Sequence, residues 1–172
     1  MAPPSRSPTD PFAAAVAMLA ARAYSVAELK QKLRRKGFGS QAIDETVLRL
    51  KKLHFLDDRK LAEHYASSLV RNRAFGRYRV ERELKSRRVD PRTVEPALQA
   101  AFEETDERAL LETVLDQKVR TLRLPVTRAR LWSLCNSLRR RGFRSDDIMK
   151  AVRARPELSP VADDAELDAL EE

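Results

Sequence analysis

Apolar residues in this chain recur every three or four positions, which is the spacing of an α-helix with one buried face. Leu29 and Leu33 show this spacing first, and Ile43, Val47 and Leu50 show it again after a short break. No stretch alternates strictly between apolar and polar residues, as a half-buried β-strand would. The pattern therefore predicts an all-α protein.

Three segments of the chain superimpose without a gap, so the chain contains an internal repeat. Segments 33–38, 84–89 and 138–143 read LRRKGF, LKSRRV and LRRRGF. The apolar positions around them keep the same register: Leu29, Val80 and Leu134; Ile43, Val94 and Ile148; Val47, Leu98 and Val152. Repeats of this kind bury their apolar faces against their neighbours. We predict three tandem three-helix repeats that form an elongated, curved array.

Cap signals place the ends of nine predicted helices. The repeats are expected over 11–55, 56–104 and 105–156, between a disordered N-terminal tail at 1–10 and an acidic C-terminal tail at 157–172. Asp10 precedes a proline at the first helical position, and Ser25 begins a capping box. Ser40 and Ser145 are expected to cap the third and ninth helices.

Two glycines are expected to end helices in the left-handed conformation. They are Gly37 and Gly142, at equivalent positions of the first and third repeats. Arg88 occupies the same position in the middle repeat. A residue with a Cβ atom costs about 1 kcal/mol in that conformation. Either Arg88 bears this cost, or the fifth helix ends differently from the other two.

Composition agrees with a soluble helical protein that has a small core. Hydrophobic residues are 42% of the chain, charged residues 35% and aromatic residues 6%. The only cysteine, Cys135, can form no disulfide within the chain and is expected to be buried among leucines. The apolar segment 13–23 is too short to span a bilayer. We expect a cytoplasmic protein.

The charge of the chain is strongly positive and unevenly distributed. The net charge is +8, but six of the 26 acidic residues lie within 163–172. Positions 1–162 then hold 34 basic and 20 acidic residues, a net charge of +14. A chain segment with this charge attracts polyanions, and nucleic acid is the commonest of them.

Two groups of basic residues are candidates for contact with DNA. The first is the repeated run Arg34, Arg35, Lys36, Lys85, Arg87, Arg88, Arg139, Arg140 and Arg141. Part of this enrichment has a structural explanation, since positive charge near a helix C-terminus stabilises the helix by about 0.3–1 kcal/mol. The second group spans 71–88 and adds Arg71, Arg73, Arg77, Arg79 and Arg82, with Phe75 and Tyr78 between them. Such aromatic residues either stack on bases or fill the joint between two helices.

The sequence gives little support for catalysis, and we expect no cofactor and no metal. His54 and His64 are ten residues apart and have no cysteine at zinc-ligand spacing. Asp57 and Asp58 precede a helix, where acidic residues are usually caps. Glycine-rich phosphate loops and nucleophile elbows are absent from the sequence. We therefore predict that the protein is not an enzyme.

The chain resembles the RecX family of bacterial regulatory proteins. The resemblance covers 13–154 and rests on three motifs: Ser25-x-x-Glu28-Leu29 with Leu33 and Gly37-Phe38; Phe55-Leu56-Asp57-Asp58 with Leu61 and Ala62; and Gly76 with Val80 and Glu83-Leu84. The junction of Leu56, Asp57 and Asp58, followed by Gly76, is the most specific part. Leu61 replaces a usual Phe, and Arg88 replaces a common Gly.

The resemblance implies a fold, a partner and a function. RecX-like proteins are non-enzymatic arrays of three-helix repeats that bind the RecA–DNA filament. They modulate, and mainly inhibit, the recombinase by binding in the filament groove, where they block extension or promote disassembly. Implied roles lie in the regulation of recombination, in DNA repair and in the SOS response. The implied partners are RecA and single- and double-stranded DNA, with the protein itself a monomer. The alternative is a basic helical DNA-binding module without a recombinase partner.

Overall fold

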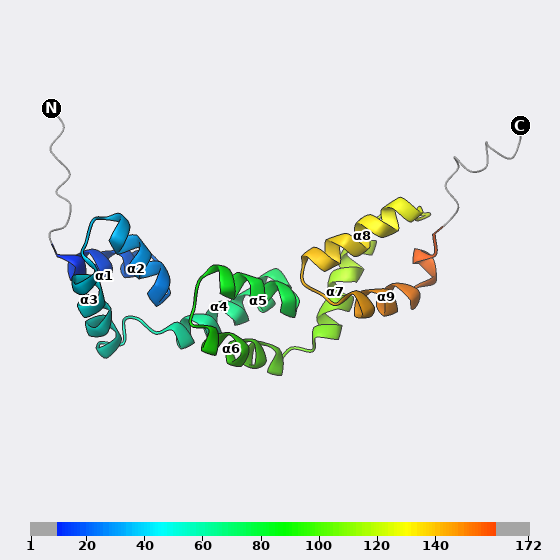
Figure 1. Ribbon diagram of the computed structural model, residues 1–172. Coiled ribbons are helices and arrows are strands. Elements are labelled where there is room, and N and C mark those ends of the chain that lie inside the picture. Colours follow the sequence, from blue (N-terminus) through cyan, green and yellow to red (C-terminus); the bar gives the residue numbers. More distant parts are fainter. Residues whose placement is uncertain (1–9, 161–172) are drawn as a thin grey trace, which may run out of the picture. The chain divides into compact units, whose positions relative to one another are not determined.

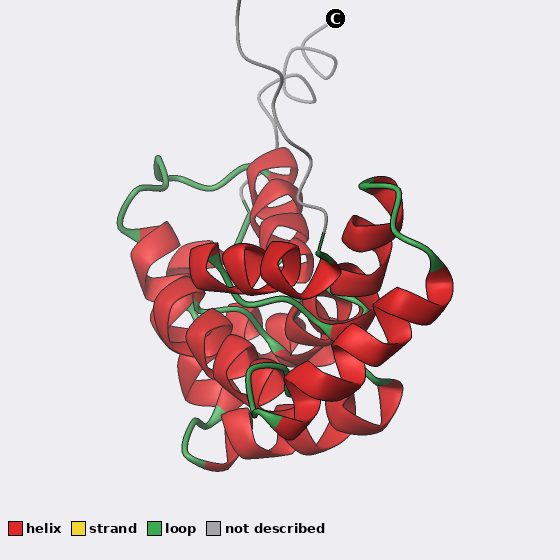
Figure 2. Cartoon of the chain, turned by 90° about the vertical axis from the view of Figure 1, so that its left-hand side faces the viewer, coloured by secondary structure: helices red, strands yellow, loops and turns green. Residues whose placement is uncertain are grey.

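The computed structural model describes residues 10–160, and nearly all of both predicted tails lies outside this range. Within it the chain is helical and has no strand, as predicted (Figures 1 and 2). The α-helices are α1 Pro11–Ala21, α2 Val26–Arg35, α3 Ser40–Lys52, α4 Asp58–Arg73, α5 Arg77–Ser86, α6 Pro91–Glu103, α7 Glu107–Val119, α8 Arg128–Arg140 and α9 Ser145–Arg153. A 3-10 turn, Pro156–Leu158, follows α9.

Helix starts follow the predicted caps at some positions and not at others. The Asp10 carboxylate accepts hydrogen bonds from the amides of the first turn of α1, and Ser25 forms the full capping box of α2. The predictions for Ser40 and Ser145 are wrong. Each is the first residue of its helix, after Gly39 and Arg144, which make no side-chain cap bond. A serine already inside the first turn is past the position from which its hydroxyl can cap.

The three equivalent helix ends share one backbone conformation. Gly37 and Gly142 have φ angles of 90° and 94°, and Arg88 has a φ of 52°. Arg88 therefore bears the cost of the left-handed conformation, which was one of the two predicted alternatives. Its guanidinium donates a hydrogen bond to Gln31 Oε1 at 3.1 Å.

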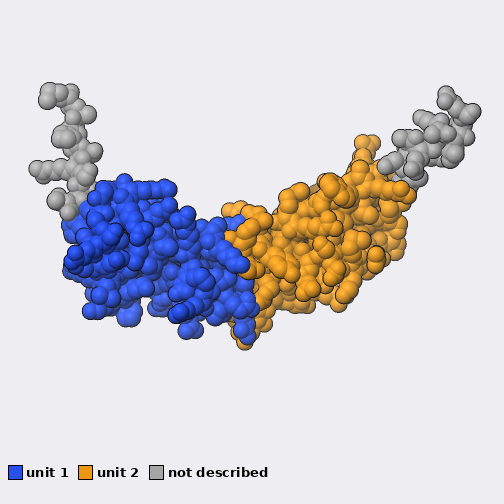
Figure 3. Space-filling view, in the orientation of Figure 1, with its two compact units in different colours: residues 1–66, 83–99 blue, residues 67–82, 100–172 orange. Residues whose placement is uncertain are grey.

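The chain divides into two compact units, coloured in Figure 3. Unit 1 contains residues 1–66 and 83–99, and unit 2 contains 67–82 and 100–172. The boundaries lie inside α4, α5 and α6, so the predicted middle repeat contributes to both units. The division into three repeats at the predicted boundaries stays a prediction.

The core of unit 1 includes a cluster of residues from α1, α2 and α3 with Leu56. Leu29, Leu33, Ile43 and Leu50 are fully buried in it. These are the positions at which the sequence repeats every three or four residues. The predicted helical period is therefore the period of the buried face.

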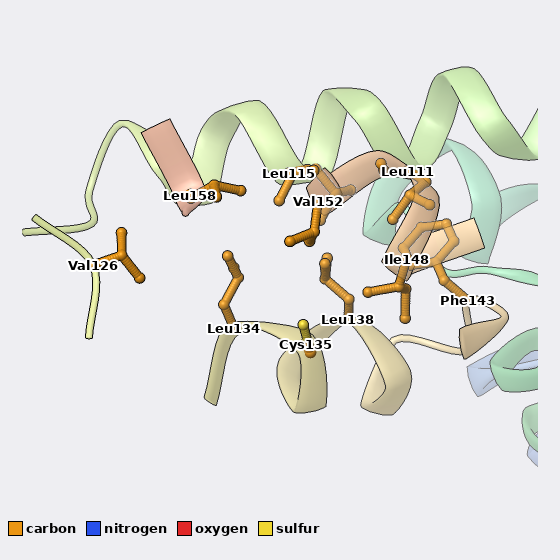
Figure 4. Close-up of a cluster of buried hydrophobic side chains, with 12 residues drawn as sticks. Leu111, Leu115, Val126, Leu134, Cys135, Leu138, Phe143, Ile148, Val152 and Leu158 are labelled. Carbon is orange, nitrogen blue, oxygen red and sulfur yellow. The ribbon is translucent and has the colours of Figure 1, made fainter. Parts of the chain in front are cut away.

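The core of unit 2 joins α7, α8 and α9. Figure 4 shows Leu134, Cys135 and Leu138 projecting from α8 toward Leu111 and other buried side chains. The burial predicted for Cys135 is confirmed, and burial raises the pKa of its thiol. Arg155 links the end of α9 to α7, since its guanidinium forms ion pairs with Glu112 at 2.8 Å and with Asp116 at 2.5 Å.

No helix within residues 10–160 is both long enough and apolar enough to cross a lipid bilayer.

Candidate nucleic-acid interface

The first basic run lies on an open surface of unit 1. Leu33 is fully buried, and Arg34, Arg35 and Lys36 after it are all exposed at the end of α2. The charge at this helix end also acts on a nearby acid. Lys30 forms an ion pair with Asp44 at 2.7 Å and holds the pKa of that carboxyl below its usual value, with a smaller contribution from Arg34.

The corner after this run has no close neighbours. A Cβ atom built at Gly37 would meet no atom within 4 Å, and the same holds at Gly39. The backbone here turns in the left-handed conformation in open space. The three charges are thus accessible to a large partner.

The second copy of the repeated basic run makes contacts inside unit 1, mainly through Arg87. The Arg87 carbonyl accepts a 2.6 Å hydrogen bond from the Ser25 hydroxyl, and its guanidinium donates to the Ala23 carbonyl at 2.7 Å. The guanidinium also pairs with Glu28 at 3.1 Å and lies 5.0 Å from the centre of the Tyr65 ring. The Arg87 side chain is only 20% exposed, so it connects the start of α2 to the end of α5.

The two junction aspartates have different structural roles. Asp57 accepts hydrogen bonds from the amides of Arg59 and Lys60 at 3.0 and 3.1 Å, which caps α4. Asp58 instead accepts from the amides of Val26 at 2.8 Å and Asp90 at 3.0 Å. One carboxylate therefore accepts hydrogen bonds from backbone amides at the starts of two other helices, α2 and α6.

Leu56 lies beside these aspartates and is 3% exposed within the unit 1 core. The junction motif thus combines a core anchor, a cap and a link between helices.

The third run lies in unit 2, where its last residue forms a tight joint. The Gly76 amide donates to the Arg141 carbonyl at 2.9 Å, and the Arg141 guanidinium donates to the Arg73 carbonyl at 2.8 Å. A Cβ atom built at Gly142 would lie 2.2 Å from the backbone nitrogen of Arg79. A Cβ atom built at Gly76 would lie 2.7 Å from backbone atoms of Gly142. Both glycines are needed because two backbones meet here. Arg139 and Arg140 remain exposed.

The basic residues of segment 71–88 differ in how far their side chains are exposed. Arg71 pairs with Glu104 at 3.2 Å, and the Arg79 guanidinium lies 5.2 Å from the centre of the Phe75 ring. Arg77 and Arg79 are partly buried, whereas Arg73, Arg82, Lys85 and Arg88 are exposed. Phe75 is also partly buried, while Tyr78 is 55% exposed.

Sequence reasoning missed one prominent surface residue, Trp132 of α8, which is 69% exposed. A signal for it was present. Leu131, Leu134, Cys135 and Leu138 mark the inner face of this helix, and position 132 lies to one side of the stripe that they form.

A hollow of about 660 Å³ in unit 1 contains both histidines. It is lined by apolar residues of α1 with Phe55, Leu61, His54 and His64. Among residues 10–160 no three histidine, cysteine or acidic side chains are grouped so that they could hold a metal ion. Asp57 and Lys60 also line the hollow, and most of its other lining residues are apolar.

Comparisons with known proteins match the chain to one family. The family model of the first three-helix domain of RecX matches residues 12–50, and that of the second three-helix domain matches residues 57–98. The regulatory protein RecX of Trichlorobacter lovleyi is 30% identical over 145 residues, which are 84% of this chain and 94% of that protein. The one from Chlorobaculum tepidum is 31% identical over 139 residues, 81% of this chain and 84% of that protein.

A solved structure shares the fold. The crystal structure of RecX from Lactobacillus salivarius superimposes with a TM-score of 0.69 at 19% identity, covering 84% of this chain and 93% of that one. The resemblance predicted from the repeat and from the Leu-Asp-Asp junction is confirmed, as is the all-helical fold of tandem three-helix domains. The chain belongs to the RecX family of regulatory proteins.

Proposed function

We propose that the protein regulates the RecA recombinase by binding the RecA–DNA filament, and that its main effect is inhibition. The observation that carries the proposal is the match to proteins named regulatory protein RecX over more than four fifths of the chain. The protein acts as a cytoplasmic monomer without a cofactor. It binds in the filament groove and blocks extension or promotes disassembly.

The exposed basic residues supply the attraction to the DNA within the filament. Each phosphate contact releases counterions, so binding weakens as salt rises. Arg87 and Arg141 are held in joints, and we assign them a structural role. The proposed contacts are the remaining exposed residues of the two basic groups: Arg34, Arg35, Lys36, Arg71, Arg73, Arg82, Lys85, Arg88, Arg139 and Arg140.

The direct test measures DNA-dependent ATP hydrolysis and strand exchange by RecA. The protein is added at less than one molecule per recombinase subunit. We expect both activities to fall, because one molecule in the groove affects several subunits. Unchanged activity at every ratio would refute the proposal.

The high isoelectric point, about 10.0, also suits a DNA-binding module without a recombinase partner. Competition between a labelled duplex and random DNA separates the two functions. A sequence-specific reader discriminates by about 4–10 kcal/mol, whereas a filament regulator shows no site preference.

A further inference from the structure

Helix α8 carries no acidic residue of its own. Its 13 residues, Arg128–Arg140, include four arginines and neither aspartate nor glutamate. Two acids of α7, Glu112 and Asp116, form ion pairs with Arg155. The positive charge of α8 is therefore available to an external anion.

Trp132 lies on α8 and is 69% exposed. Leu134, Cys135 and Leu138 of the same helix point into the core (Figure 4). A buried tryptophan removes about 150–250 Å² from water. Trp132 leaves most of this area exposed, so its indole is accessible for stacking on a partner.

Cationic side chains flank the indole along the helix. Arg128 lies four residues before Trp132, and Asn136 and Arg139 lie four and seven residues after it, so all share one side of α8. The Arg139 guanidinium donates a 3.0 Å hydrogen bond to Asn136 Oδ1, which holds it along this side. The result is an aromatic platform between two positive charges.

The other flank of α8 also attracts anions. A pocket of about 220 Å³ lies between α7 and α8, lined by Lys118, Arg130 and Ser133 among others. Burial lowers the pKa of Lys118, and the positive charges of Arg141 and Arg140 lower it further. An anion bound here would relieve the repulsion among these cations.

We propose that α8 contacts single-stranded DNA, with a base stacked on Trp132 and the neighbouring phosphates held by Arg128 and Arg139. Within the proposed function, this assigns the filament regulator a contact for unpaired nucleotides. A duplex hides the faces of its bases, whereas every unpaired base offers a π-face. The site should therefore prefer single strands and tolerate any sequence. The absence of acids favours nucleic acid over a protein surface as the occupant.

The chain contains one tryptophan, so its fluorescence reports this site alone. The experiment titrates the full-length protein, without recombinase, with oligo(dT) of about 20 nucleotides. Fluorescence anisotropy of labelled DNA measures binding in parallel. We expect oligo(dT) to quench the tryptophan in step with binding, and a hairpin duplex to quench it far less. Binding of oligo(dT) without a change in emission would overturn the proposal, and so would equal quenching by the duplex.

Variants give a second measurement. Replacing Trp132→Ala should weaken single-strand affinity about 10-fold, and Trp132→Phe should retain part of it, since the smaller ring can still stack on a base. Leu48→Ala removes another exposed apolar side chain, 57% exposed in unit 1, and should leave affinity unchanged. Circular dichroism verifies the fold of each variant. Wild-type affinity in the Trp132→Ala protein would contradict the assignment.

A separate experiment with RecA filaments distinguishes the nucleotide contact at α8 from the proposed regulation of RecA. Emission that responds to RecA filaments but not to DNA alone would make Trp132 a protein contact and would overturn the nucleotide assignment. Quenching by DNA together with unaffected RecA activity would instead uphold this site and refute the proposed function.

Discussion

The corners at Gly37 and Gly142 have nearly the same sequence and the same backbone conformation, but opposite surroundings. Their φ angles are 90° and 94°. A Cβ atom at Gly37 would touch nothing, whereas one at Gly142 would lie 2.2 Å from a backbone nitrogen. One copy of the motif is an open surface, and the other is an internal joint.

The comparison separates two roles of the repeated basic run. In the other two copies the residue before the left-handed position is Arg87 or Arg141, and its carbonyl accepts a hydrogen bond at the start of another helix. The Arg87 guanidinium also donates near the start of α2, and that of Arg141 donates to Arg73 at the end of α4. In the first copy Lys36 occupies the equivalent position and is exposed. The same basic position therefore has a packing role in two copies of the repeat. In the first copy its charge is accessible to a partner.

The largest expected effect comes from Gly142→Ala. The new methyl group adds overpacking of about 1–3 kcal/mol to a left-handed cost of about 1–2 kcal/mol. We expect the free energy of unfolding to fall by about 3 kcal/mol or more, measured by urea denaturation.

Gly37→Ala is the matched control for that experiment. It has the same backbone and open space, so it should cost only about 1 kcal/mol. Equal losses in the two variants would show that the joint at Gly142 is looser than its geometry indicates.

A smaller loss is expected from Ser25→Ala at the corner of the middle copy. Ser25 is fully buried, its hydroxyl donates to the Arg87 carbonyl at 2.6 Å, and it caps α2. Removing it leaves a carbonyl without its donor and a helix without its cap, at a cost of about 2 kcal/mol.

Ser40→Ala serves as the comparison for Ser25→Ala. Ser40 is exposed and makes no cap bond, so its loss should change the free energy of unfolding by less than about 0.5 kcal/mol. A similar destabilisation by both variants would mean that only helix propensity matters here.

Arg88→Gly should change stability in the opposite direction. Glycine removes a left-handed cost of about 1–2 kcal/mol, and its greater freedom in the unfolded chain offsets part of this gain. We expect a rise in the free energy of unfolding of about 0.5 kcal/mol by the same denaturation assay. A clear loss would show that the hydrogen bond from Arg88 to Gln31 outweighs the backbone strain.

The smallest effect on stability is expected where the corner is open. Replacing Arg34, Arg35 and Lys36 together by glutamate should shift the melting temperature little, because all three side chains are exposed. Filament inhibition should weaken, most strongly at low salt, because phosphate contacts are lost. Full inhibition at every salt concentration would remove this corner from the interface.

The helices were predictable from the sequence because their buried faces repeat with helical period. Leu29 and Leu33 lie in the core as expected, and the capping box at Ser25 is formed. Ser40 and Ser145 were assigned as caps because serine is favoured at the residue just before a helix. A serine hydroxyl can cap only from that residue, and the sequence does not show that both helices begin one residue earlier.

The candidate site was less predictable because it depends on contacts between distant segments. Nothing local distinguishes Lys36 from Arg141, and only the folded chain shows that Arg141 reaches the carbonyl of Arg73. The role of Asp58 was hidden for the same reason, since its partners Val26 and Asp90 are each 32 residues away. Trp132, in contrast, could have been found from the helical period alone.

The boundaries between the two units lie within α4, α5 and α6 rather than in a loop. Independent domains are usually joined by an accessible linker, where proteases cut and where shortened gene products can end. This chain offers no such place in its middle, because each crossing is made by hydrogen-bonded helix. A fragment that stops near residue 66 or 99 would end inside a helix and would expose apolar side chains to water. Neither unit should therefore be found as a stable fragment on its own.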